Sequence, residues 1–107
     1  MKYYIMVQFT ITDTKWISKY TKEATKLLEN WGGKYLARTN RIEAVEGNIE
    51  LNTFVVLTEW PSKEKAESFY NSQEYSSYRK DRISGTNGIL LLFPGEDITN
   101  ESELYCK

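Results

Sequence analysis

The sequence predicts an α+β domain with the element order β-α-β-β-α-β and a four-stranded antiparallel sheet. Alternating side chains at residues 2–9, 54–60 and 89–93 are typical of strands. Two stretches between these strands, 13–31 and 62–83, carry apolar residues at helical spacing. A further strand after the first helix completes the order, and no internal repeat or long linker divides the chain.

The first helix has recognisable signals at both ends. Asp13 is a suitable N-cap, because its side chain can accept a hydrogen bond from a backbone N–H of the first turn. The diglycine Gly32-Gly33 follows the last apolar turn and supplies the left-handed residue with which many helices end. The apolar positions share an arc of about 120°, and they are Trp16, Ile17, Tyr20, Ala24, Leu27, Leu28 and Trp31.

The middle of the chain predicts two strands and a helix start. Residues 34–46 are expected to form a strand interrupted near Thr39-Asn40, before glycine and asparagine at 47–52 turn the chain. Pro61 ends the strand at 54–60, and Ser62 caps the next helix.

The second helix is expected to break at Asn71-Ser72 and then to continue to residue 83. Its inward-facing positions are predicted to be Ala66, Phe69, Tyr70, Tyr75, Tyr78, Arg79, Arg82 and Ile83. Pro94-Gly95 closes the last strand. We therefore expect one domain, residues 1–95, followed by a polar C-terminal tail, residues 96–107.

Composition excludes several function classes. The chain has 107 residues, a net charge of −1 and no histidine, and its single cysteine is Cys106. Scattered charges argue against nucleic-acid binding, and no apolar run reaches the length of a membrane helix or a signal peptide. The missing histidines exclude Ser-His-Asp and Cys-His nucleophiles and leave no zinc site. We expect a cytoplasmic protein without metal or cofactor.

The predicted strands are apolar on both faces, although two helices cover only one face of a four-stranded sheet. Large exposed apolar patches are rare on monomers. A homodimer in which two sheets face each other would hide the second face. The alternative is a monomer with some exposed aliphatic side chains.

A series of motifs resembles a widespread bacterial family of unassigned function in the dimeric α+β barrel superfamily. The motifs are Gly32-Gly33-Lys34-Tyr35-Leu36-Ala37-Arg38, Glu46-Gly47, the segment 55–62, Tyr70-Asn71-Ser72-Gln73-Glu74-Tyr75, and Arg82. Distant members of the superfamily include cofactor-free antibiotic-biosynthesis monooxygenases, muconolactone isomerases and haem-binding proteins. The resemblance implies a ferredoxin-like protomer, dimerisation through the sheets, and a cleft between sheet and helices.

One bend departs from the family pattern. The chain has Arg38-Thr39-Asn40 where the family tends to have Arg-Gly-Gly, so the backbone here is expected to differ.

The candidate site centres on arginines of the second helix. Arg79 and Arg82 share an inward stripe with Tyr75, and a buried guanidinium needs a carboxylate or a ligand anion. Glu46 and Glu59 are the expected partners or bases, Tyr75 a hydrogen-bond donor, and Arg38 a second anion anchor. In this interpretation the pocket holds a small acidic or enolic molecule. The alternative is a structural Arg-Glu pair near a helix C-terminus.

Three function classes share this topology. The first is a small-molecule enzyme or binder without metal or cofactor, and the second is a noncatalytic regulatory or interaction homodimer. The third, an RNA-recognition motif, needs exposed aromatic and basic residues on its third strand. The segment 54–60 is aliphatic in its middle and carries an acid, which argues against RNA binding. Whether the protein is an enzyme stays open at this stage.

Overall fold

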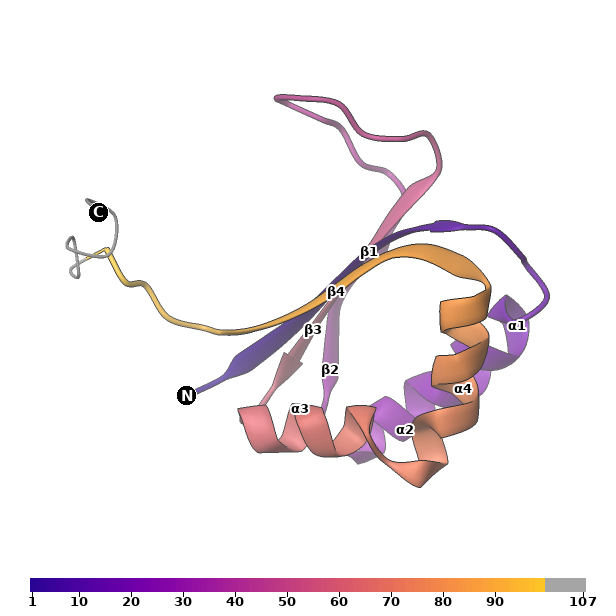
Figure 1. Ribbon diagram of the computed structural model, residues 1–107. Helices are drawn as coiled ribbons and strands as arrows, with labels where there is room; N and C mark the ends of the chain where they lie inside the picture. The colour runs from indigo at the N-terminus through magenta and orange to yellow at the C-terminus, as the bar shows by residue number, and fades with distance from the viewer. Residues whose placement is uncertain (100–107) are drawn as a thin grey trace.

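A computed structural model describes residues 1–99, in which four strands form one antiparallel sheet (Figure 1). The strands are β1 (Tyr3–Ile11), β2 (Lys34–Thr39), β3 (Thr53–Trp60) and β4 (Thr86–Pro94), in the order β2-β3-β1-β4. The predicted element order and fold class are confirmed. Cys106 and the part of the predicted tail beyond Thr99 lie outside the described residues, and the domain boundary at residue 95 stays a prediction.

All helices lie on one side of the sheet (Figure 1). Three consecutive segments, α1 (Ile17–Lys19), the π-helical η1 (Tyr20–Ala24) and α2 (Thr25–Asn30), form the first helical run, and α3 (Lys63–Tyr70) and α4 (Gln73–Ser84) form the second. No helix among the described residues combines the length and apolarity needed to cross a membrane.

The start of the first helical run differs from the prediction. Asp13 is not the N-cap: its Oδ1 accepts a hydrogen bond from the Lys15 backbone N–H at 2.9 Å, within a turn that precedes the helix. The helix begins at Ile17 after Trp16, which provides no side-chain cap. Asp13 therefore satisfies its side chain locally, in an Asx turn, before the helix has begun.

The signals of the second helical run are confirmed. Ser62 Oγ accepts a hydrogen bond from the Lys65 backbone N–H at 3.2 Å. Ser72 Oγ accepts one from the Tyr75 backbone N–H at 3.2 Å and so restarts the helix after the predicted break. Each serine satisfies one of the N–H groups that an α-helix leaves unpaired at its first turn.

The diglycine ends the first run as a Schellman motif. Gly32 has a φ of 100°, and its N–H donates to the Glu29 carbonyl while the Gly33 N–H donates to the Leu28 carbonyl, each at 3.0 Å. The left-handed residue is thus Gly32. Gly33 is needed for space, because a Cβ there would lie 2.6 Å from Leu28 Cδ2 and 2.7 Å from Trp60 Cζ2.

The strand predicted over 34–46 ends at Thr39, so its second half is wrong. Residues 40–52 instead form a long connection that projects beyond the sheet (Figure 1). β2 is the edge strand and β3 begins only at Thr53, so this connection has no strand beside it to pair with. An extended sequence without such a partner cannot complete its backbone hydrogen bonds as a strand.

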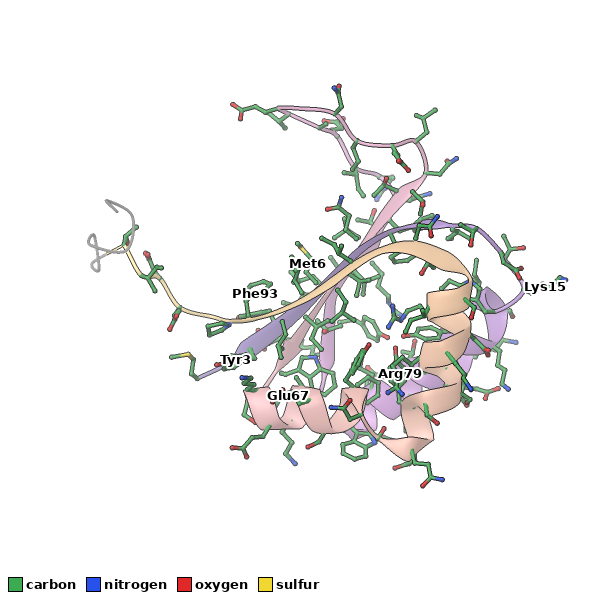
Figure 2. The ribbon with its side chains drawn as sticks, in the orientation of Figure 1. Tyr3, Met6, Lys15, Glu67, Arg79 and Phe93 are labelled. Atoms are coloured by element: carbon green, nitrogen blue, oxygen red, sulfur yellow. The ribbon has the colours of Figure 1, made fainter. Side chains whose placement is uncertain are left out.

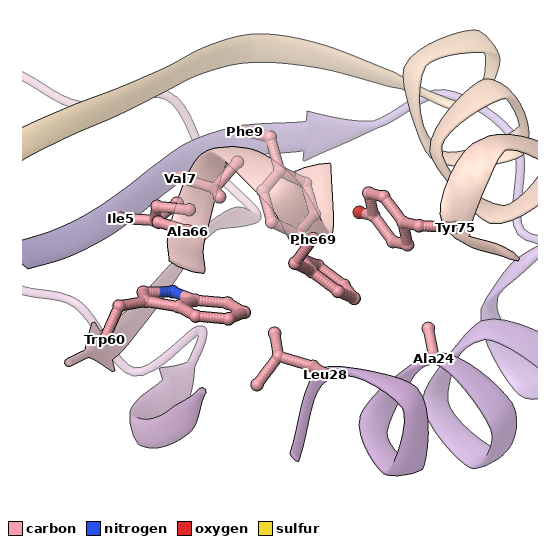
Figure 3. Close-up of a cluster of buried hydrophobic side chains, with 9 residues drawn as sticks. All are labelled: Ile5, Val7, Phe9, Ala24, Leu28, Trp60, Ala66, Phe69 and Tyr75. Atoms are coloured by element: carbon pink, nitrogen blue, oxygen red, sulfur yellow. The ribbon is translucent and has the colours of Figure 1, made fainter. Parts of the chain in front are cut away.

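The core lies between the sheet and the helices. Trp60 is fully buried at the end of β3, where its Nε1–H donates to Thr58 Oγ1 at 2.9 Å. The Phe69 ring contacts two other aromatic rings: its centroid lies 5.2 Å from that of Trp60 and 4.4 Å from that of Tyr75. The buried apolar cluster (Figure 3) consists of Ile5, Val7, Phe9, Ala24, Leu28, Trp60, Ala66, Phe69 and Tyr75.

The opposite face of the sheet is apolar and carries no helix of the described residues (Figure 1). Met6 lies at its centre, opposite Leu57 of β3 and Leu91 of β4, and Figure 2 shows Met6 and Phe93 on the side away from the helices. Leu91 is 44% and Phe93 38% exposed. We call this surface, formed by Met6, Val55, Leu57, Ile89, Leu91 and Phe93, the open face.

Candidate functional site

A β-bulge in β2 places one aromatic and one cationic side chain, those of Tyr35 and Arg38, on the helix side of the sheet. Tyr35 lies opposite Thr58 and Arg38 opposite Val56, with the extra residue between Tyr35 and Ala37. In a regular strand, residues three apart point to opposite faces, whereas the bulge lets both point the same way. The Arg38 guanidinium lies 3.7 Å above the Tyr35 ring, and Nη1 donates to Thr25 Oγ1 of α2 at 2.8 Å.

A cavity of about 510 Å³ lies between this side of the sheet and the first helical run. Its apolar floor includes Phe9 and Phe54, whose stacked rings are 5.6 Å apart at an angle of 14°. Its volume falls within the range of small-molecule sites. The polar lining is Tyr20, Thr21, Tyr35, Arg38, Thr39, Asn40, Arg41 and Arg82.

Arg82 of α4 is the buried cation of the cavity. The side chain is only 8% exposed, and its Nε–H donates to Tyr75 Oη at 3.3 Å. Nη2 is buried and has no hydrogen-bond partner among the described residues. Burial acts to lower the pKa of Arg82, but the combined interactions with Tyr75, Tyr20 and Tyr70 raise the pKa above its ordinary value, so the guanidinium keeps its charge. A buried charge with an unpaired N–H group is costly unless an anion meets it.

Tyr20 of η1 extends this polar chain. Its hydroxyl oxygen lies 2.5 Å from Tyr75 Oη, which in turn accepts from Arg82. Burial, with a smaller contribution from Tyr75, raises the pKa of Tyr20 far above its ordinary value. Tyr20 therefore stays protonated at neutral pH, and either hydroxyl of the Tyr20–Tyr75 pair can donate to the other. Tyr20 is the first residue of the π-helical segment η1. Such backbone irregularities are often found at functional sites.

Three of the six predicted site residues come together, and the other three, Arg79 and the two glutamates, lie apart. Arg82 and Tyr75 are hydrogen-bonded, and Arg38 lines the same cavity as Arg82. Arg79 (Figure 2) does not line it: Nη1 donates to the Tyr70 carbonyl, and the guanidinium lies 5.1 Å from the centroid of the Tyr70 ring. Arg79 thus secures the junction between α3 and α4.

The predicted carboxylate partners of Arg82 are elsewhere. Glu59 accepts from Lys2 Nζ at 3.0 Å and from Tyr4 Oη at 3.3 Å, and it lies opposite Tyr4 in the pairing of β3 with β1. The hydrogen bond from Lys2 lowers the pKa of Glu59. Glu46 is exposed in the projecting connection 40–52. The expected pairing of Arg82 with Glu59 or Glu46 is therefore wrong.

Tyr20 and Tyr35 are site residues that the sequence did not indicate as such. Tyr20 has the same helical spacing as its buried neighbours, so the pattern marks it only as core. Tyr35 joins the site through the bulge, which depends on pairing with β3. No group of three or more His, Cys, Asp or Glu side chains in residues 1–99 is arranged to hold a metal ion.

Several solved structures share this fold at low sequence identity. SnoaB, a cofactor-independent oxygenase from Streptomyces nogalater, is 9% identical with a TM-score of 0.64, over 90% of this chain and 94% of SnoaB. RPA0582, a protein of unknown function from Rhodopseudomonas palustris, is 14% identical with a TM-score of 0.72, over 90% and 84% of the two chains.

A third structure comes from Bacteroides thetaiotaomicron and is described as a protein of unknown function and possible oxidoreductase. It is 15% identical with a TM-score of 0.59, over 86% of this chain and 95% of that one. No curated protein matches the chain.

The family resemblance rests on nearly the whole chain. Residues 2–96 match the family model described as "Domain of unknown function (DUF1330)". The structural neighbours share the α+β fold of this chain. The chain therefore belongs to the DUF1330 family, whose function is not assigned.

Proposed function

We propose that the cavity binds a small molecule with a flat apolar body and an acidic or enolic oxygen, which Arg82 holds as its anion. The observation that carries the proposal is the buried Nη2 of Arg82, which has no partner among the described residues. A ligand oxygen would satisfy this donor and neutralise the charge. Such charge-assisted hydrogen bonds are about twice as strong as neutral ones.

The remaining lining supports the same class of ligand. Phe9, Phe54 and Val56 offer an apolar surface for a ring system, and the Phe9 and Phe54 rings are nearly parallel to each other. When Tyr75 donates to Tyr20, the Tyr20 hydroxyl hydrogen is left for a ligand oxygen as a second donor near Arg82. A few placed polar groups in a mainly apolar cavity are characteristic of sites for small organic molecules.

Binding is the part of the function that the geometry supports. Conversion of the ligand without metal or cofactor is the extension that the likeness to SnoaB suggests. A shared fold does not carry a reaction with it, so the site itself has to justify any chemistry. Neither predicted base reaches the cavity, since Glu46 is exposed in the connection and Glu59 is engaged by Lys2.

An acid and its matched amide test the proposed binding. Naphthoate is expected to raise the melting temperature of the protein, whereas naphthamide, of the same shape but neutral, is not. At a concentration of 100 dissociation constants the stabilisation amounts to about 2.7 kcal/mol. Differential scanning fluorimetry across a panel of aromatic acids, phenols and their neutral analogues measures the effect.

The variant Lys80→Ala serves as control, because it removes an exposed cation from the same helix outside the cavity. It should respond to naphthoate as the parent does. Equal shifts with the acid and the amide, or no shift with any acid or phenol, would contradict the proposal.

We also propose that the protein is a homodimer through the open face. The face is apolar across β1, β3 and β4, and the Lys2–Glu59 ion pair at 3.0 Å leaves no uncompensated charge on that carboxylate. A largely apolar surface of this kind suits a second copy of itself related by a two-fold axis. If the dimer forms and no small molecule stabilises it, the noncatalytic interaction function becomes the better explanation.

A further inference from the structure

The lining of the cavity is cationic at two separate places, which bears on the shape of its ligand. Arg82 lies at one place, and Arg38 with Arg41 at the other; Asp and Glu are absent from the lining formed by the described residues. We infer that the ligand is a flat apolar diacid whose two carboxylates are at opposite ends, one meeting Arg82 and the other Arg38. This inference rests on the proposed function.

The pairing of the strands separates the two cations. Arg38 of β2 lies opposite Val56 of β3, and Val56 lies opposite Val7 of β1, so these three residues form one row across the sheet. Neighbouring strands are about 4.8 Å apart, which places β2 and β1 about 10 Å from each other.

Arg82 lies at the β1 end of this row. It lines the main cavity together with Val7 and Phe9 of β1, and it shares a second, smaller cavity of about 160 Å³ with the same two residues and with Leu90 of β4. Arg38 is absent from the smaller cavity. Arg38 therefore lines the cavity from the side of β2, and Arg82 from the side of β1 and β4.

The surface between the two cations is apolar. Val56 and Phe54 are the residues that β3 contributes to the main cavity, and neither side chain can form a hydrogen bond. A ligand that is complementary to this lining has the same layout, with an apolar ring system in the middle and an anionic group at each end. A monoacid would leave one cationic end in contact with apolar surface or solvent.

Arg38 is held in place and can still bind. Its guanidinium stacks on Tyr35 and donates from Nη1 to Thr25 Oγ1. A guanidinium has five N–H donors, so this contact leaves others for a carboxylate. Stacking on an aromatic ring also fixes the plane of the group, which favours a carboxylate in a bidentate arrangement.

Isothermal titration calorimetry with naphthoate and with naphthalene dicarboxylate, substituted at opposite ends, tests the inference. In the parent protein the diacid is expected to bind at least about tenfold more tightly than the monoacid. In Arg38→Gln the diacid is expected to lose its advantage over the monoacid, so that the two ligands bind with similar affinity. Lys80→Gln makes the same change in net charge away from the cavity and should change the affinity of neither ligand.

Two results would overturn the diacid assignment and leave the proposed function standing. One is equal affinity of monoacid and diacid in the parent; the other is an equal loss for both ligands in Arg38→Gln, which would make Arg38 part of the cavity wall. If neither compound binds the parent, both the inference and the proposed function fail.

Discussion

Replacing Gly33 with Val is expected to abolish stable folding or to lower the free energy of unfolding by at least about 3 kcal/mol, the upper range for an overpacked core. The Cβ of the valine alone would lie 2.6 Å from Leu28 Cδ2 and 2.7 Å from Trp60 Cζ2. Trp60 is fully buried and Leu28 is 6% exposed, so neither side chain has room to move aside. Urea denaturation followed by far-UV circular dichroism measures the loss.

The neighbouring Gly32 provides the matched control. Gly32 has a φ of 100°, but a Cβ there would meet only Pro61 at 3.7 Å, an ordinary contact. Asparagine tolerates left-handed backbone better than other residues with a side chain, so Gly32→Asn should cost only about 1 kcal/mol. If Gly33→Val unfolds at the same urea concentration as the parent, the packing of α2 against Trp60 is not as described.

A lysine at the centre of the open face is expected to dissociate the proposed homodimer. Leu57 lies opposite Met6 of β1 and Ala37 of β2, in the middle of the sheet. In the dimer, Leu57→Lys would bury an unpaired charge against apolar side chains, an effect of about 3 kcal/mol or more, which weakens association over 100-fold. In the monomer the same lysine reaches solvent, so the fold should persist.

Light scattering at micromolar concentration measures this change. The parent should show twice the chain mass of 12.5 kDa, and Leu57→Lys should show the single mass with an unchanged circular dichroism spectrum. Ser68→Lys adds the same charge at an exposed position of α3 and should remain dimeric. A parent that is already monomeric, or a Leu57→Lys variant that stays dimeric, would rule out the open face as the interface.

The elements of the fold were predictable where local chemistry determines them. Ser62 and Ser72 cap their helices with their own side chains, and Gly32-Gly33 ends the first run through bonds to residues only a few positions away. The second half of the strand predicted at 34–46 failed because a strand depends on a neighbour. The start of β3 was predicted within one residue, but the sequence does not reveal the register of its pairing with β2, which ends at Thr39 opposite Val55.

The site was predictable in part for the same reason. Tyr75 and Arg82 are seven residues apart on α4, so helical spacing alone places them together. Glu59 was misplaced because β3 is apolar on both faces, and the alternation does not say which face the helices cover. Arg38 and Tyr35 share the cavity only because of the bulge, which is a property of the pairing between β2 and β3.

The central claim is that Arg82 is kept for a ligand anion and not for a structural ion pair. The most direct test is the free energy of unfolding of Arg82→Met, measured by urea denaturation with and without naphthoate. Methionine fills a similar volume, and Arg82 has no carboxylate partner among the described residues that would be left buried and unpaired. We expect Arg82→Met to be as stable as the parent or more stable, as when buried charges are replaced by apolar side chains, and naphthoate should not stabilise it. A loss of about 3–5 kcal/mol without ligand, the value for breaking a buried ion pair, or a naphthoate response equal to that of the parent, would contradict it.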